Sequence, residues 1–120
     1  MGDRGQVHIV DEGIWLYTHW GATELVNTVV KALSRRLRWG DPEYLTRMIF
    51  QEMLGDDKSE LGYGIGSKQH WDIWRIVEIN VSEQKVIVRD ANEDKVEWSG
   101  SFEDFVNDFG QRKYLRSCFK

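Results

Sequence analysis

The first part of the chain changes from strand-like to helical patterning. Val7–Val10 and Ile14–Thr18 are short runs rich in β-branched and aromatic residues. Asp11-Glu12-Gly13 lies between them, and this turn predicts a β-hairpin. From about residue 22 to residue 36, apolar residues recur every third or fourth position, which predicts an amphipathic helix. Residues 1–6 are polar and contain glycine, so we expect a loose terminus there.

A second helix has the clearest start signal in the chain. Asp41 is a good N-cap, Pro42 suits the first helical position, and Gly55 follows the last apolar residue. Only a few residues separate the two helices, which predicts a helical hairpin. Glu52 is the one carboxylate on the apolar stripe of the second helix, and we expect it to pair with an arginine such as Arg75.

The rest of the chain is dominated by strand-like runs. Three such runs are separated by short polar turns: 71–81, 85–89 and 95–98. A last helix is predicted from Ser101 to just before Gly110, and the tail 111–120 has enough apolar residues to add another strand. The segments together predict one α+β domain over residues 1–120, an antiparallel sheet (β-β-α-α-β-β-β-α) with the helices packed on one face.

Composition limits the classes of function. The chain carries a net charge of −4, and its basic cluster (Lys31, Arg35, Arg36 and Arg38) lies where cations complement the end of a helix. We therefore expect no duplex nucleic acid as a partner. The single cysteine, Cys118, excludes an intramolecular disulfide and a thiolate metal cluster. We expect neither a targeting segment nor a membrane span, which favours a cytoplasmic protein.

No grouping of residues predicts a catalytic or metal site. His8, His19 and His70 match no metal-ligand spacing, so we expect no metal and no cofactor. Ser67 near His70 lacks the signature of an activated nucleophile. The glycines of 62–66 fail the spacing of phosphate-binding loops, and a loop or hairpin connection is the simpler interpretation. These observations favour a protein that is not an enzyme.

One segment is nevertheless a candidate ligand site. Residues 17–23 pass from a predicted strand to a predicted helix, and such a turn leaves backbone N–H groups that favour an anion. With the glycine-rich segment 62–70, it would offer ring faces and polar edges to a nucleotide or a phosphorylated small molecule. The candidate ligand-binding residues are Tyr17, His19, Trp20, Gly21, Thr23, Tyr63, Lys68 and His70. The alternative is that these rings belong to the core and that Gly21 is only a turn residue.

The aromatic content suggests a binding surface. Six tryptophans in 120 residues are more than a small core encloses easily, and we expect at least two to be partly exposed. An acidic, aromatic-rich surface without a catalytic grouping favours a non-enzymatic interaction protein, whose partner is another protein or a second copy in a homodimer. The alternative is a binder of, or an enzyme acting on, a nucleotide or phosphorylated small molecule at the strand-to-helix turn.

Three segments also carry a resemblance. They are Trp15-Leu16-Tyr17-Thr18-His19-Trp20-Gly21, Trp39-Gly40-Asp41-Pro42-Glu43-Tyr44-Leu45 and Gly62-Tyr63-Gly64-Ile65. In this combination the chain resembles a group of small prokaryotic and phage proteins of unassigned function. The resemblance covers most of the chain. It implies a single-domain fold and carries no catalytic residues with it.

Overall fold

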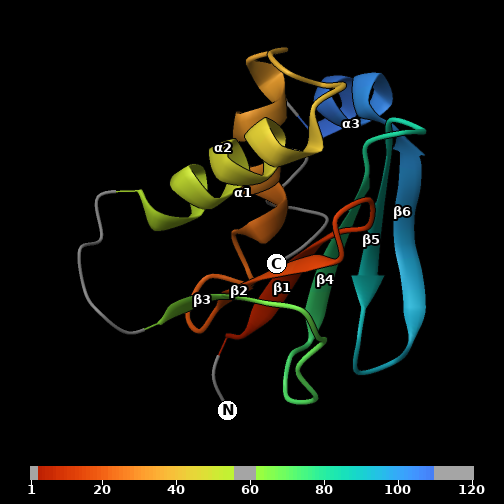
Figure 1. Ribbon diagram of the computed structural model, residues 1–120. Helices are drawn as coiled ribbons and strands as arrows, with labels where there is room; N and C mark the ends of the chain where they lie inside the picture. Colours follow the sequence, from red (N-terminus) through yellow and green to blue (C-terminus); the bar gives the residue numbers. More distant parts are fainter. Residues whose placement is uncertain (1–2, 56–61, 110–120) are drawn as a thin grey trace.

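The computed structural model describes residues 3–55 and 62–109. The helices of this part lie on one side of a twisted sheet (Figure 1). The elements in chain order are β1 (Gly5–Ile9), β2 (Ile14–Thr18), α1 (Leu25–Ser34), α2 (Pro42–Leu54), β3 (Tyr63–Gly66), β4 (Arg75–Asn80), β5 (Lys85–Asp90), β6 (Lys95–Ser101) and α3 (Phe102–Phe109). This arrangement confirms the α+β class.

The sheet is mixed, so the expectation of a purely antiparallel sheet is wrong. Its strand order is β3-β2-β1-β4-β5-β6. The β1–β2 hairpin and the β4–β5–β6 meander are antiparallel as predicted, but β4 runs parallel to β1. The reason is the path of the chain: after the helices it adds β3 beside β2, and then crosses to the other side of β1.

The additional strand is β3, which falls where the sequence predicts a loop or hairpin connection. Two of its four residues are glycines, whose strand propensity is low. Pairing with the open edge of β2 overrides this local preference. Tyr63 also packs against the core. The element order is therefore β-β-α-α-β-β-β-β-α.

The core lies between the helices and one face of the sheet. Alternate strand residues point to this face, which we call the inner face: they include Val7, Ile9, Leu16, Val77, Ile79, Val86 and Val88, all fully buried. From α3, Phe105 and Phe109 pack against the ring of Trp98 at centroid distances of 5.4 and 5.2 Å. The opposite face, the outer face, is covered by none of the described helices (Figure 1).

The helix boundaries follow the capping signals. The Asp41 side chain accepts a hydrogen bond from the backbone N–H of Tyr44, and Pro42 occupies the first turn of α2 as predicted. Ser101 caps α3 by accepting from the N–H of Asp104. The start of α1 is later than predicted, at Leu25.

Two further expectations need correction. Residues 3–6 are not loose, because β1 begins at Gly5 and the side chain of Gln6 is 1% exposed. Glu52 does pair with an arginine as expected, but this arginine is Arg35 and not Arg75. Arg75 instead pairs with Glu97. The predicted tail strand and Cys118 lie outside the described residues.

Two of the six tryptophans are exposed, as expected: Trp20 at 54% and Trp71 at 93%. Within residues 3–55 and 62–109, no helix is long and apolar enough to span a bilayer.

Candidate functional site

The turn between β2 and α1 has its backbone donors occupied. The N–H of Gly21 donates to Thr18 Oγ1 at 3.1 Å. The N–H of Ala22 donates to the carbonyl oxygen of Asp3 at 3.0 Å, and the N–H of Thr23 donates to Asp3 Oδ2 at 2.9 Å. The expectation of unpaired N–H groups is therefore wrong at these three positions. A carboxylate of the chain lies where we expected an external anion.

Asp3 is also held from a third direction. Its Oδ1 accepts a hydrogen bond from Trp74 Nε1 at 2.9 Å. Burial alone would raise the pKa of the Asp3 carboxyl, but its hydrogen bonds from Thr23 and Trp74 and the charge of Arg75 lower the pKa below its usual value. Asp3 is thus an ionised group that ties the N-terminus to the turn and to the start of β4.

The predicted aromatic residues do contact one another in a row. Tyr17 stacks on His70 at a centroid distance of 4.5 Å, and its hydroxyl lies 2.9 Å from His19 Nδ1. The ring of Trp20 meets His19 at 5.4 Å and Tyr63 at 6.3 Å, in both cases edge to face. Binding of a ligand by this row stays a prediction.

The two ends of this row lie on different faces of the sheet. Tyr63 pairs with Thr18, so both point inward, whereas the neighbouring Tyr17 points outward. The connection between β3 and β4 crosses the outer face over Gln6, whose side chain donates to the carbonyl oxygen of Lys68 and accepts from the N–H of His70. His70 therefore stacks on Tyr17 on the outer face, and Lys68 is held beside Gln6 through its carbonyl oxygen.

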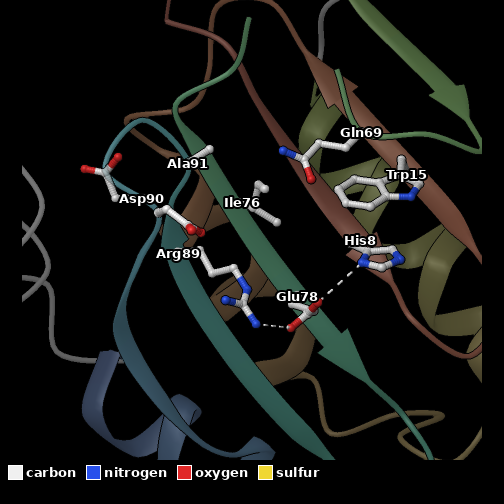
Figure 2. A pocket seen from close by; sticks show the side chains of 9 residues that line it. His8, Trp15, Gln69, Ile76, Glu78, Arg89, Asp90 and Ala91 are labelled. Atoms are coloured by element: carbon white, nitrogen blue, oxygen red, sulfur yellow. Dashed lines mark hydrogen bonds and ion pairs between the residues drawn. The ribbon is translucent and has the colours of Figure 1, made fainter. Parts of the chain in front are cut away.

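A concavity of about 350 Å³ lies on the outer face beside this connection (Figure 2). We call it the outer-face pocket. Four neighbouring strands and the two adjoining connections supply its lining: His8, Trp15, Gln69, Ile76, Glu78, Arg89, Asp90, Ala91 and Asp94. His8, Trp15, Ile76, Glu78 and Arg89 point outward because the strand residues that alternate with them fill the core, whereas Asp90 is the last residue of β5 and borders the pocket beside the following turn.

Side chains in the outer-face pocket are ordered by mutual contacts. His8 and Trp15 are directly paired across β1 and β2, and their rings stack at 3.8 Å with an interplanar angle of 8°. Glu78 lies between His8 and Arg89: Oε1 accepts from Arg89 at 3.3 Å, and Oε2 lies 3.5 Å from His8 Nδ1, longer than an ordinary hydrogen bond. Figure 2 shows His8 and Arg89 converging on Glu78.

The charge of the outer-face pocket is negative. Its lining holds three carboxylates, Glu78, Asp90 and Asp94, and one guanidinium, Arg89, which leaves a formal charge of −2 when His8 is neutral. Burial lowers the pKa of the His8 imidazole, although the Glu78 carboxylate opposes this shift. The neutral form of His8 is therefore favoured at neutral pH, and the pocket favours a cationic group.

Sequence reasoning missed this pocket for a topological reason. The alternation of strand residues already indicates that His8, Trp15, Glu78 and Arg89 point away from the apolar positions beside them. Bringing them together requires the order β2-β1-β4-β5, and the chain separates β2 from β4 by more than fifty residues. The polar and aromatic residues at outward positions of these strands were the signal in the sequence that could have indicated the pocket.

Within the described residues, no three or more His, Cys, Asp or Glu side chains are grouped so that they would hold a metal ion. Of the three histidines, His8 stacks on Trp15 and His19 accepts a hydrogen bond from Arg4.

Comparison with known proteins gives no match to a family model, a curated protein or a solved structure. The resemblance to small prokaryotic and phage proteins therefore stays a prediction.

Proposed function

We propose that this protein is a non-enzymatic interaction protein, and that its outer-face pocket binds a basic side chain of a partner protein. The observation that carries the proposal is the negative lining beside a tryptophan ring, on the sheet face that none of the described helices covers. A lysine or arginine side chain has both an apolar stem and a cationic head, so it needs both kinds of surface.

The pocket offers these surfaces side by side. Ile76 and Trp15 are apolar walls for a side-chain stem, and an aromatic ring also attracts a cation. Asp90 and Asp94, at the end of β5 and in the following turn, offer carboxylate oxygens to the head group. A volume of about 350 Å³ is at the small end of ligand pockets, which suits one or two inserted side chains.

The polar groups of the pocket are engaged with one another in a way that favours binding over catalysis. His8 is fixed by its stack on Trp15, and Glu78 is shared between His8 and Arg89. A general base needs access to the substrate proton that it abstracts, and the contacts of Glu78 with His8 and Arg89 limit that access. The nine lining residues include no serine, threonine, cysteine or lysine.

The strand-to-helix turn supports the alternative function less well. An anionic ligand there would have to displace the Asp3 carboxylate from the N–H of Thr23. For this reason we do not propose a nucleotide or phosphorylated small molecule as the ligand. A cytoplasmic location is part of the proposal, because a chain with one cysteine needs no oxidising compartment.

Calorimetric titration with two defined peptides tests the proposal. The first peptide carries two arginines among glycines and serines, and the second carries citrulline in their place, which is neutral and nearly the same shape. We expect the wild-type protein to bind the arginine peptide at least about tenfold more tightly than the citrulline peptide. A tenfold difference in Kd corresponds to about 1.4 kcal/mol of binding free energy.

The matched variants are Asp90→Asn with Asp94→Asn, and as a control Asp104→Asn with Asp108→Asn on α3. The Asp90→Asn change keeps a side-chain oxygen that can accept from the turn N–H groups, as Asp90 Oδ1 does from the N–H of Asn92. The pocket pair should weaken binding by about tenfold and the control pair by less than about twofold. Equal binding of both peptides would refute the proposal. A wild-type protein that forms a dimer, together with an Asp90→Asn, Asp94→Asn variant that does not, would also refute it, because the partner would then be a second copy of the chain.

A further inference from the structure

A second concavity, of about 320 Å³, lies on the helical layer, where α1 passes into α2. We call it the basic groove. Its lining combines three arginines (Arg35, Arg38 and Arg47) with the apolar or aromatic side chains of Leu37, Tyr44 and Met48. It contrasts with the net charge of −4 of the whole chain. It also lies on the opposite layer of the fold from the outer-face pocket.

The connection between α1 and α2 holds an apolar side chain outward in a fixed backbone. Arg36 and Arg38 have φ angles of 56° and 59°, in the left-handed region that residues other than glycine, asparagine and aspartate rarely adopt. Leu37, between them, is 56% exposed. The two left-handed arginines carry a backbone cost, and the conformation they impose places Leu37 in one concavity with Tyr44 and Met48.

Contacts on both sides keep this conformation in place. Arg36 donates two hydrogen bonds to the carboxylate of Glu103 on α3, at 2.6 and 3.1 Å. The indole N–H of Trp39 donates to the carbonyl oxygen of Leu33 at the end of α1. The connection is therefore anchored to the core, and the groove beside it is preformed.

The charges of the basic groove are only partly neutralised. Arg35 pairs with Glu52, and Arg38 lies 3.9 Å from Asp41. Arg47 has as its hydrogen-bond partner the neutral amide of Gln51, at 2.8 Å. Three guanidinium groups against two carboxylates leave one positive charge. The guanidinium of Arg38 also lies over the exposed ring of Tyr44, at 4.3 Å from its centroid.

We propose that the basic groove binds an acidic segment of a partner protein in which an aliphatic side chain lies next to a carboxylate. The aliphatic side chain covers Leu37 and the floor formed by Met48, which is nearly buried. The carboxylate accepts hydrogen bonds from Arg47 and Arg38, since a planar guanidinium suits this geometry. Charge complementarity and the exposed leucine together specify this occupant.

Fluorescence anisotropy with labelled peptides tests the inference. The probe alternates glutamate with leucine among serines; one matched peptide replaces glutamate by glutamine and another replaces leucine by serine. We expect the probe to bind at least about tenfold more tightly than either matched peptide. Binding should weaken as salt is raised, because exposed charges are screened.

Paired variants locate the binding. Arg38→Gln with Arg47→Gln should weaken binding of the probe by about tenfold, and Leu37→Ser by about fivefold. The charge-matched control, Lys85→Gln with Lys95→Gln on β5 and β6, should leave binding unchanged. Because residue 38 has a positive φ, Arg38→Gly is a second variant that removes the charge while keeping a permitted backbone.

Several outcomes would overturn the inference. Equal binding of the glutamine peptide, or full binding by the arginine variants, would show that the groove does not recognise carboxylates. Competition by inorganic phosphate, RNA or anionic vesicles that is insensitive to Leu37→Ser would show general anion binding. Self-association lost in the arginine variants would identify a second copy as the occupant. Asp90→Asn with Asp94→Asn should leave this binding intact, so the two proposals fail separately.

Discussion

Replacing Asp3 by alanine tests the finding that a carboxylate of the chain occupies the turn between β2 and α1. The variant removes the acceptor for two donors, the N–H of Thr23 and the indole N–H of Trp74. The backbone carbonyl of residue 3 still accepts from Ala22. The change therefore removes the side-chain contacts of Asp3 and leaves the backbone contact of the same residue in place.

The magnitude follows from the number of hydrogen bonds. Each typical hydrogen bond contributes about 1 kcal/mol, so we expect the free energy of unfolding to fall by about 2 kcal/mol. For a chain of 120 residues the entropy of unfolding is roughly 250 cal/mol/K, which converts this loss into a decrease in Tm of about 8 °C.

The pH dependence gives an independent readout. The pKa of Asp3 is lower in the folded protein than in the unfolded chain, where it is about 3.9. The ionised carboxylate therefore adds its full stability above that value and loses it as the pH falls through the folded-state pKa. The stability difference between wild type and Asp3→Asn should be largest near neutral pH and shrink in acid.

Urea unfolding followed by circular dichroism, at several pH values, measures both quantities. The control is Glu12→Ala, an exposed change in the β1–β2 turn that should alter stability by less than about 0.5 kcal/mol. An Asp3→Ala variant as stable as the control, or a difference from wild type that does not change with pH, would refute the role given to Asp3.

Three further predictions concern packing and His8. Gly62→Ala should destabilise the fold by about 3 kcal/mol, because Gly62 has a φ of 99° and a Cβ there would lie 2.1 Å from the ring of Trp20. In a Trp20→Ala background the same change should cost only about 1 kcal/mol, and an additive double-mutant cycle would contradict the contact. Phe105→Ala should cost about 3–5 kcal/mol in thermal unfolding, since its ring is fully buried in the core. NMR titration of His8 should give a pKa below the ordinary histidine value of 6.5. Glu78→Gln should lower the pKa of His8 further, because the Glu78 carboxylate raises it. An unchanged or higher pKa of His8 in this variant would exclude the interaction.

Local signals in the sequence were sufficient for most helices and strands. Asp41 and Pro42 fix the start of α2, and Ser101 fixes the start of α3, because capping depends on neighbours in the chain. The short polar turns between the later strand-like runs also predict the meander. These features depend on contacts over a few residues, which a single sequence displays directly.

The features that were not predicted depend on distant contacts. Asp3 meets Thr23 across 20 residues and Trp74 across 71 residues, so the filling of the turn is not visible from the turn itself. β3 is glycine-rich and forms because the edge of β2 is available to it. The parallel pairing of β1 with β4, which also creates the outer-face pocket, requires the strand order.

The candidate site shows the same division. Ring contacts among Tyr17, His19 and Trp20 follow from their closeness in the chain, and the structure contains them. The partners that occupy the backbone donors of the turn come from elsewhere in the sequence. Prediction from sequence therefore found a cluster of rings but misjudged the groups available to a ligand.

Two-dimensional NMR of the protein, titrated with the arginine peptide, locates the surface that binds a basic partner. If the partner binds to the outer face of the sheet, as we propose, chemical-shift changes should be centred on the indole N–H of Trp15, the guanidinium of Arg89 and the amides of β4 and β5. Changes centred on residues 17–23, or no changes beyond those produced by the citrulline peptide, would contradict it.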